Sequence, residues 1–384
     1  MAKINSTQAS VSSIVQAKAD ERIRQMKTYR HLFEEIITDE NIELAIKEAY
    51  RSRKKSKKKR GKLEKLRVHE HRIEIVRKWI TNYKCIKRDP REIYDGISRK
   101  KRYIFVPSVR ENVVQHAVVQ VLDKYLSKGT YEHCYAAIKG RGQHKAKKYV
   151  EKWIRKHPKD CRYYLKMDIK QYFPSVPQKI LIEKLEHKVR DHRTIQLIKD
   201  ILATSDEGIP LGYYISQWFA NFYLQELDHT ISEFPGKKMY IRWMDDMVIF
   251  SGNKRRLHRY KNDIEAELEK IGLKLKDNWR IERFDHKDGG CFLDFMGFRF
   301  YRSKTTLRRS IFLRMCRKAR RMHKKEKPTL FECRQALSYL GWIKDSDTYG
   351  AYLEYVKPFV NYQQIKRRIS RHDRRENKEC NTSE

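Results

Sequence analysis

The fold is decided by the stretch Ile241-Arg242-Trp243-Met244-Asp245-Asp246-Met247-Val248-Ile249-Phe250. Apolar, β-prone residues flank two adjacent carboxylates, which is the pattern of a β-hairpin with Asp245 and Asp246 at its tight turn. Two neighbouring carboxylates repel each other unless a cation offsets their charge. Mg²⁺ prefers oxygen ligands and binds a few protein carboxylates together with substrate phosphates. The stretch therefore predicts a hairpin with a metal site at its tip, although an Asp-Asp pair alone also occurs on ordinary surfaces.

A second carboxylate follows another strand-like run, Leu165-Lys166-Met167-Asp168. If this strand and the hairpin lie in one sheet, Asp168 and Asp245 can hold two metal ions about 4 Å apart, an arrangement that stabilises the attacking and leaving oxygens of phosphoryl transfer. The ordinary alternative is that Asp168 caps a helix at a strand–helix junction. That alternative explains Asp168 but not the second acidic motif further along the chain.

A glycine- and proline-containing loop, Gly208-Ile209-Pro210-Leu211-Gly212, lies between the two acidic motifs and leads into an amphipathic stretch. Such a loop before a helix lets backbone approach a flat base or a sugar closely. Taken alone, it is better explained as an ordinary turn before a capped helix.

The charge balance points to a polyanionic partner. The 384 residues include 87 Lys and Arg against 49 Asp and Glu, a net charge of +38. Nucleic acid is the commonest polyanion that fits such a charge. The run Arg51–Lys62 is mostly basic and predicts phosphate contacts, although a solvated loop or a nuclear-type signal would have the same composition. The lysines expected to bind nucleic acid there are Lys54, Lys55, Lys57, Lys58 and Lys59.

Several other classes of protein are disfavoured by the composition. No apolar run approaches 18 residues and no secretory signal is evident, so we expect a soluble, cytoplasmic protein that does not bind a membrane. The seven cysteines form no CxxC pair, which argues against a disulfide framework and a zinc knuckle.

In this order and spacing, the three segments resemble the reverse transcriptases of bacterial retroelements, namely group II introns, retrons and diversity-generating retroelements. The resemblance covers about residues 90–360. It implies an α+β right-hand polymerase fold with fingers, an antiparallel-sheet palm and a helical thumb. The expected order is an N-terminal helical and basic extension (1–62), fingers (63–162), palm with some fingers elements (163–305), thumb (306–365) and a basic tail (366–384).

The resemblance also implies roles for individual residues. Asp168, Asp245 and Asp246 would be catalytic and would hold Mg²⁺, or Mn²⁺, together with Ile169. Phe173 falls where the family excludes a 2′-hydroxyl with an aromatic ring, although plain core packing would explain it too. The expected nucleotide-binding residues are Arg102, Phe173, Leu211, Gly212 and Gln217. The expected primer grip is Phe295, Met296 and Gly297, and further nucleic-acid contacts are expected from Arg141, Arg308 and Arg309.

Departures from the general pattern favour the diversity-generating subgroup. Leu211 stands where most such enzymes have Gln, Ser216-Gln217 replaces Ser-Pro, and Trp279 replaces a Lys of group II enzymes. Trp243 takes the place of the usual Tyr, and because both rings are large and flat we expect activity to survive.

The expected function is an RNA-directed DNA polymerase that copies a dedicated RNA into error-prone cDNA. Its expected partners are template RNA, nascent cDNA and dNTPs, with a small basic accessory protein or self-association. Two alternatives stay open. One is a phage-defence reverse transcriptase that uses a noncoding RNA or no template, and the other is a catalytically silent RNA-binding protein.

Overall fold

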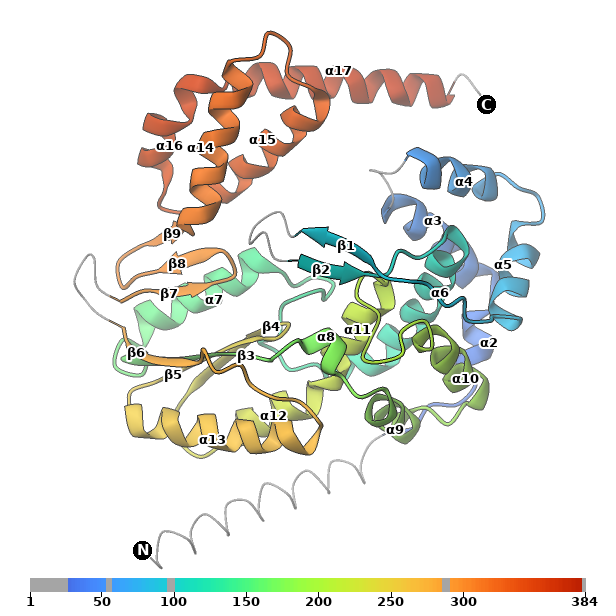
Figure 1. Ribbon diagram of the computed structural model, residues 1–384, viewed down its shortest axis with the longest axis horizontal. Helices are drawn as coiled ribbons and strands as arrows, with labels where there is room; N and C mark the ends of the chain where they lie inside the picture. The colour runs from blue at the N-terminus through green and yellow to red at the C-terminus, as the bar shows by residue number, and fades with distance from the viewer. Residues whose placement is uncertain (1–26, 53–56, 95–100, 285–290, 382–384) are drawn as a thin grey trace, which may run out of the picture. The chain divides into compact units, whose positions relative to one another are not determined.

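The structure is a computed structural model that describes residues 27–52, 57–94, 101–284 and 291–381 (Figure 1). The chain divides into two compact units. The first comprises Met1–Gly142 and Leu165–Ile281, and the second comprises Gln143–Tyr164 and Glu282–Glu384. The chain therefore passes from the first unit to the second, returns to the first and ends in the second.

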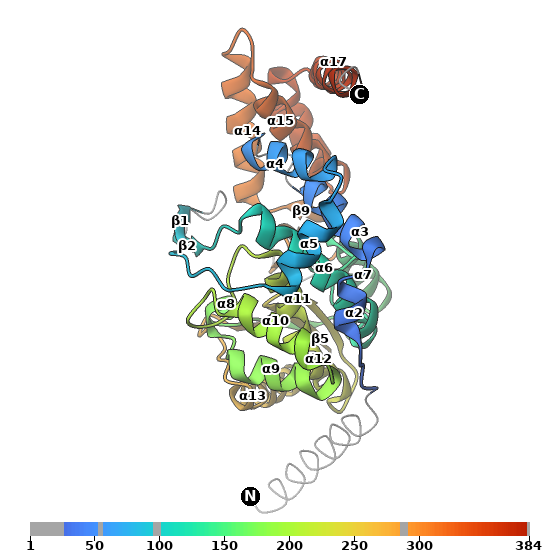
Figure 2. The same ribbon diagram turned by 90° about the vertical axis from the view of Figure 1, so that its right-hand side faces the viewer.

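A cluster of helices occupies the N-terminal part of the first unit. Its members are α2 (Leu32–Ile36), α3 (Asp39–Ser52), α4 (Lys57–Arg67), α5 (Arg72–Thr81) and α6 (Val109–Leu126). The first four all contact α6, around which they gather in Figures 1 and 2. Helix α6 begins at a capping box, in which Ser108 and Glu111 each accept a hydrogen bond from the backbone N–H of the other. Most of its residues are buried, so α6 is the core of this cluster.

A four-stranded sheet forms the centre of the second half of this unit. Its strands are β3 (Tyr163–Asp168), β4 (Met239–Trp243), β5 (Asp246–Ser251) and β6 (Arg280–Arg283), in the order β4-β5-β3-β6. Strands β4 and β5 are antiparallel. Ile241, Val248 and Ile249 are fully buried. The apolar run that predicts the hairpin therefore lies in the core.

Further helices and one hairpin complete the first unit. They are β1 (Arg91–Tyr94), β2 (Lys101–Ile104), α8 (Tyr172–Ser175), α9 (Gln178–Lys188), α10 (His192–Leu202), α11 (Tyr214–Tyr223), α12 (Gln225–Glu233) and α13 (Lys254–Lys270). Strands β1 and β2 pair in antiparallel fashion. Helices α12 and α13 contact each other and run beside the sheet, with α13 against β5 (Figure 1).

The second unit combines a small sheet with helices. Its elements are α7 (Gln143–Lys156), β7 (Leu293–Phe295), β8 (Phe298–Phe300), β9 (Thr305–Leu307), α14 (Arg309–His323), α15 (Leu330–Lys344), α16 (Tyr349–Tyr355) and α17 (Tyr362–Asn381). The three strands are antiparallel in the order β7-β8-β9. The ring of Trp342 in α15 lies 5.2 Å from that of Phe298 in β8, so this helix packs on the small sheet. Helices with antiparallel hairpins in both units make the α+β class predicted from the sequence.

Two expected segment ends fall inside helices. Residue 62, the expected end of the N-terminal extension, lies within α4, and residue 366, the expected start of a basic tail, lies within α17. Helix α17 is basic, but Asn361 accepts hydrogen bonds from the backbone of Gln363 and Gln364 at its start, and the helix contacts α15. Capping and packing thus make the described part of this tail helical. Within the described ranges, no helix is both long and apolar enough to cross a membrane.

Candidate active site

The acidic hairpin has a two-residue turn. Trp243 pairs with Asp246 across β4 and β5, which leaves Met244 and Asp245 as the turn. Met244 has a φ of 58°, the left-handed conformation that such tight hairpin turns require. Asp245 therefore lies at the tip and Asp246 begins β5. The hairpin predicted from the sequence is confirmed.

The end of β3 lies beside this turn, because β3 neighbours β5 in the sheet. The backbone N–H of Ile169 donates to the carbonyl of Asp245 at 3.3 Å. The charge of Asp168 also lies near enough to Asp245 to raise the pKa of its carboxyl group. The expectation that Asp168 and the hairpin belong to one sheet is confirmed, and the two acidic motifs converge.

Two lysines that sequence reasoning missed contact the acidic cluster. The ammonium group of Lys276 lies 2.5 Å from Oδ1 of Asp168, and that of Lys166 lies 3.3 Å from Oδ2 of Asp246. The backbone of Lys276 also donates to the carbonyl of Asp168 at 2.8 Å, which fixes its position beside β3. Both lysines therefore offset part of the negative charge of the cluster.

Burial and mutual repulsion raise the pKa of both hairpin carboxyls. Burial is the main cause for Asp245, and the nearby charge of Asp168 adds to it. Burial likewise raises the pKa of Asp246 to about 7, although Lys166 opposes this shift. Both groups are therefore harder to ionise than carboxyls in water. A cation beside them would lower their pKa and favour the ionised carboxylates.

The donor set of this cluster fits a divalent metal. Among the residues described, no group of three or more His, Cys, Asp or Glu side chains is arranged to hold a metal ion, and lysines contact two of the three carboxylates. However, Oδ1 of Asp246 is buried and has no hydrogen-bond partner in the described part of the chain. A buried polar atom without a protein partner calls for an explanation, and a cation bound beside this carboxylate oxygen would supply one. Carboxylate oxygens are the ligands that Mg²⁺ and similar hard cations prefer.

The glycine- and proline-containing loop lies between two other predicted segments. The N–H of Ile209 donates to the carbonyl of Phe173 at 2.9 Å, and the N–H of Phe105 donates to the carbonyl of Leu211 at 2.7 Å. Phe105 directly follows β2, the strand that carries Arg102. Main-chain hydrogen bonds thus connect the three segments predicted to bind the incoming nucleotide.

Both glycines of this loop are required by close backbone contacts. A Cβ on Gly208 would lie 2.4 Å from the carbonyl oxygen of Phe173, and one on Gly212 would lie 2.4 Å from that of Phe105. Their φ angles of 65° and 106° are also strained for any other residue. Glycine is therefore needed for the loop to reach both neighbours.

The predicted nucleotide-binding side chains differ in exposure. Phe173 and Leu211 are half-buried, whereas Arg102, Gly212 and Gln217 are exposed. The ring of Phe173 packs edge-on against that of Tyr172, with ring centroids 5.8 Å apart.

Helix α6 anchors the residues that follow the loop, which sequence reasoning also missed. The hydroxyl of Tyr213 donates to Oε1 of Glu111 at 2.7 Å, and the N–H of Tyr214 donates to Oε1 of Gln115 at 2.8 Å. Glu111 and Gln115 lie one helical turn apart on the same face of α6, and this spacing was the available signal.

The predicted primer grip forms the tip of another hairpin, in the second unit. Phe295 pairs with Phe298 across β7 and β8, so Met296 and Gly297 form the turn. Gln143 donates to the carbonyl of Met296 at 2.5 Å. The ring of Phe295 is fully buried, so it supports the hairpin from the core, whereas the turn itself comes from Met296 and Gly297.

The predicted phosphate contacts around α4 are only partly described. Lys54 and Lys55 lie outside the described residues, and Lys57 begins α4. Lys58 is exposed, whereas Lys59 is half-buried and donates to the carbonyl of Pro107 at 2.6 Å. The basic run thus holds at least one lysine that packs within the first unit.

Three further arginines were predicted to bind nucleic acid. Arg141 donates to the carbonyls of Tyr131, Glu132 and Cys134, and Arg308 forms an ion pair with Asp294 at 2.5 Å. Arg309 is exposed at the start of α14. The structure therefore gives Arg141 and Arg308 contacts within the protein, and their binding of nucleic acid stays a prediction.

Comparison with known proteins places this site in a family. Residues 86–278 match the family described as "Reverse transcriptase (RNA-dependent DNA polymerase)". The chain is 24% identical over 214 residues to the Retron Ec73 reverse transcriptase of Escherichia coli, covering 51% of this chain and 65% of that protein. It is 23% identical over 253 residues to Protein YkfC of Escherichia coli strain K12, covering 54% of this chain and 65% of that protein.

Two further likenesses concern a protein of another organism and a solved structure. An uncharacterized 91 kDa protein in a cob intron of Schizosaccharomyces pombe is 29% identical over 160 residues, covering 39% of this chain and 19% of that protein. A solved structure of Candida albicans telomerase with a fragment of telomeric RNA has a TM-score of 0.44 and 13% identity, covering 75% of this chain and 57% of that one. The chain thus spans less than two thirds of the length of the relatives that it matches. Because the family match covers half of the chain and includes Asp168, Asp245 and Asp246, the chain belongs to the reverse transcriptase family.

Proposed function

We propose that the protein is an RNA-directed DNA polymerase that copies a dedicated RNA into cDNA. The observation that carries this proposal is the convergence of Asp168 with the Asp245-Asp246 turn, next to a main-chain-linked loop that can receive a nucleotide. A protein that only bound RNA would gain nothing from three acidic side chains, because each of them repels phosphate.

The protein's own residues have distinct roles in this proposal. Asp168, Asp245 and Asp246 supply the carboxylate oxygens, and Ile169 adds a backbone position beside them. Two divalent ions held there, Mg²⁺ or Mn²⁺, would stabilise the charge on the attacking and leaving oxygens. Lys166 and Lys276 balance the charge of the cluster.

The nucleotide itself would lie against the loop. Leu211 and Gly212 would face the base, Phe173 the sugar and Arg102 the triphosphate, where a guanidinium matches phosphate geometry. Template RNA, cDNA and dNTPs are thus the proposed partners. Met296 and Gly297 would contact the primer, and a small basic accessory protein or self-association would complete the assembly.

Primer extension by Asp245→Asn tests the catalytic assignment. We expect extension to fall by more than a hundredfold while RNA binding stays close to that of the wild type, because one charged ligand is lost without a change of shape. Asp263→Asn, an equivalent change at an exposed position of α13, serves as the matched control and should extend normally. If Asp245→Asn extends primers at a rate within tenfold of the wild type, at equal protein and Mg²⁺ concentrations, the active-site proposal is contradicted.

We further propose that synthesis is error-prone, as in diversity-generating retroelements. The support is Leu211, whose backbone is held by Phe105 while its side chain is half-buried at the loop. Leu offers dispersion contacts but no directional hydrogen bond, so correct and incorrect base pairs are separated by less free energy. A polar contact of this kind typically changes selectivity by about 1–3 kcal/mol, or roughly ten- to a hundredfold.

Deep sequencing of cDNA copied from one defined RNA tests this second step. We expect Leu211→Gln to lower misincorporation opposite template adenine more than opposite the other three bases, which serve as the internal control. A wild-type error spectrum that is flat across template bases would contradict the mutagenic role and favour a phage-defence enzyme that uses a noncoding RNA or no template.

A further inference from the structure

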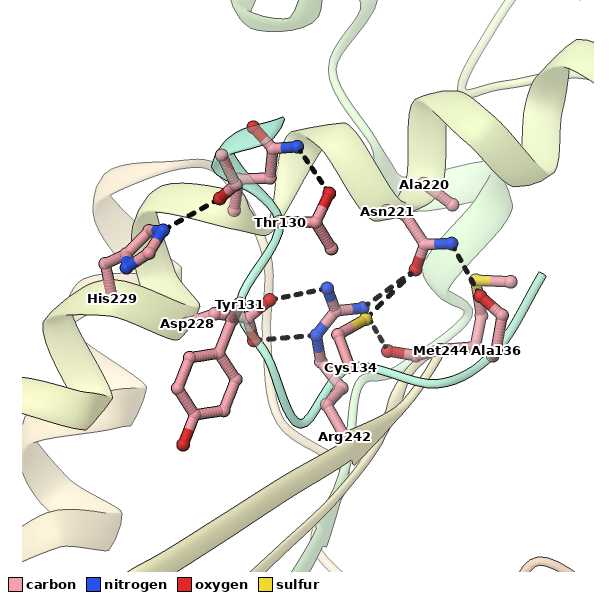
Figure 3. Close-up of polar contacts among 12 residues, drawn as sticks. Thr130, Tyr131, Cys134, Ala136, Ala220, Asn221, Asp228, His229, Arg242 and Met244 are labelled. Carbon is pink, nitrogen blue, oxygen red and sulfur yellow. Dashed lines mark hydrogen bonds and ion pairs between the residues drawn. The ribbon is translucent and has the colours of Figure 1, made fainter. Parts of the chain in front are cut away.

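A fully buried ion pair lies behind the acidic turn. Arg242 in β4 and Asp228 in α12 are both 0% exposed. The guanidinium makes two parallel hydrogen bonds to the carboxylate, from Nε to Oδ1 at 2.7 Å and from Nη2 to Oδ2 at 2.6 Å (Figure 3). Arginine and aspartate are almost never fully buried unless they are paired, so this fork-shaped contact explains how both are tolerated in the core.

The remaining nitrogen of Arg242 reaches the turn itself. Nη1 donates to the carbonyl of Met244 at 2.8 Å and lies 3.3 Å from Oδ1 of Asn221 (Figure 3). Met244 is the turn residue with the left-handed backbone, a conformation that a side chain with a Cβ rarely adopts. The guanidinium thus holds the carbonyl of the strained residue that immediately precedes Asp245.

Further hydrogen bonds surround Arg242 in the described part of the chain. Asn221 in α11 donates through Nδ2 to the carbonyl of Ala136 at 2.8 Å. The backbone of Arg242 accepts a hydrogen bond from Tyr135 at 3.2 Å and donates one to His133 at 3.1 Å. One side chain therefore joins the acidic turn to α11, the helix that follows the loop at Gly212.

Stability alone does not account for this arrangement. Replacing a buried ion pair by apolar side chains of similar volume is often neutral or stabilising, because the two charges lose their hydration. What apolar residues cannot reproduce is the donor to the carbonyl of Met244. We propose that Arg242 is a positioning residue that holds the Asp245-Asp246 turn in the geometry that binds metal, with Asp228 as the group that orients the guanidinium. This inference rests on the proposed polymerase function.

Arg242→Lys tests the inference with the least disturbance. Lysine keeps a charge beside Asp228, but its single nitrogen cannot bridge Asp228, Asn221 and the carbonyl of Met244 together. We expect at least a tenfold weaker affinity for Mn²⁺, measured by electron paramagnetic resonance without nucleotide, and a fall in kcat of ten- to a hundredfold, the usual consequence of a misplacement near 1 Å.

Tyr240→Phe is the matched control. Tyr240 is buried on the same strand and donates to Oδ1 of the same carboxylate at 2.7 Å, but no hydrogen bond joins its side chain to the described part of the turn. It should lower the melting temperature without changing Mn²⁺ affinity. If Arg242 were only structural, both variants would lose stability and neither would change metal binding.

A second variant covers the case in which Arg242→Lys does not fold. The double variant Asp228→Leu/Arg242→Met removes both charges of the buried pair. We expect it to fold and to show the same loss of Mn²⁺ affinity. Wild-type Mn²⁺ affinity and kcat in either folded variant would overturn the inference, as would failure of both variants to fold, since the pair would then act in folding alone. An inactive wild-type protein whose Mn²⁺ affinity still depends on Arg242 would instead refute the proposed function and leave the positioning role standing.

Discussion

A methyl group added at Gly212 tests whether nucleotide binding requires the close approach of this loop to the residue that follows β2. In Gly212→Ala the new carbon would lie 2.4 Å from the carbonyl oxygen of Phe105, about 1 Å inside ordinary van der Waals contact. The neighbouring atom is backbone that follows β2, so no side chain can rotate away to make room. Either the loop or the strand end that carries Arg102 must move.

The size of the effect follows from two contributions. A non-glycine residue at a φ of 106° costs about 1–3 kcal/mol. Separation of the loop from the strand also breaks the 2.7 Å hydrogen bond from Phe105 to Leu211, which contributes about 1 kcal/mol. We therefore expect a loss of about 2–4 kcal/mol in the stability of this loop, and a shift near 1 Å typically costs about a hundredfold in rate.

Steady-state incorporation of a single dNTP gives kcat and KM separately, and thermal unfolding gives the stability. We expect kcat/KM for Gly212→Ala to fall by about a hundredfold, with KM rising because the proposed nucleotide-binding loop is displaced. Gly61→Ala in α4 is the matched control, because a Cβ there meets nothing within 4 Å. That change should stabilise the helix by about 0.5–1 kcal/mol and leave kcat/KM unchanged. Wild-type kcat/KM in Gly212→Ala would refute the role assigned to the loop.

Two further predictions concern lysines. Neutralising the exposed Lys58, Lys62 and Lys65 of α4 should flatten the salt dependence of RNA binding by about 2 units of slope, at about 0.7 per phosphate contact. Lys59→Met should instead lower the melting temperature, since Lys59 donates a hydrogen bond to the carbonyl of Pro107. If filter binding gives the triple variant the same salt slope as the wild type, these lysines of α4 do not contact phosphate. Burial lowers the pKa of Lys238 to about 8 from 10.5, so the unfolded chain binds more protons between these values and the free energy of unfolding rises with pH across this window. Lys238→Met should flatten that rise in denaturation curves, and an unaltered pH dependence would contradict it.

The sequence predicts the parts of the site that depend on local pattern. Alternating and continuous apolar residues identify the hairpin at Asp245, and the strand-like run before Asp168 identifies its neighbour. Both are confirmed because strand formation and turn chemistry are encoded within about ten residues. The prediction that they share one sheet needed the family resemblance, since periodicity does not say which strands pair.

Contacts between side chains distant in sequence could not be predicted in this way. Lys276 reaches Asp168 from the segment after α13, and nothing in its own neighbourhood marks it as a partner. Arg242 did carry a signal, because an arginine inside an apolar strand must be paired if it is buried. The pattern does not identify Asp228 as that partner, because several acidic residues precede β4.

The net charge overestimates how many basic residues are available to contact nucleic acid. Within a chain of +38, Arg242, Arg141 and Lys59 all direct their charge at groups inside the protein. A basic side chain that donates to backbone carbonyls organises the chain by hydrogen bonding, and it does so whether or not a polyanion is near. Composition therefore gives an upper bound on phosphate contacts, and the exposed residues of α4 are the better place to look for them.

The way in which the site is assembled explains why departures from the family pattern need not abolish it. The loop, β3 and the acidic turn are joined mainly through backbone groups, from Phe105 to Leu211, from Ile209 to Phe173 and from Ile169 to Asp245. Main-chain hydrogen bonds persist when a side chain changes, so a Leu at position 211 or a Trp at position 243 can alter selectivity while the frame survives. The hydrogen bond from Arg242 to the turn is different, because it comes from a side chain. Substitution there removes a support that no backbone group replaces, so Arg242 is where we expect the frame to be most sensitive.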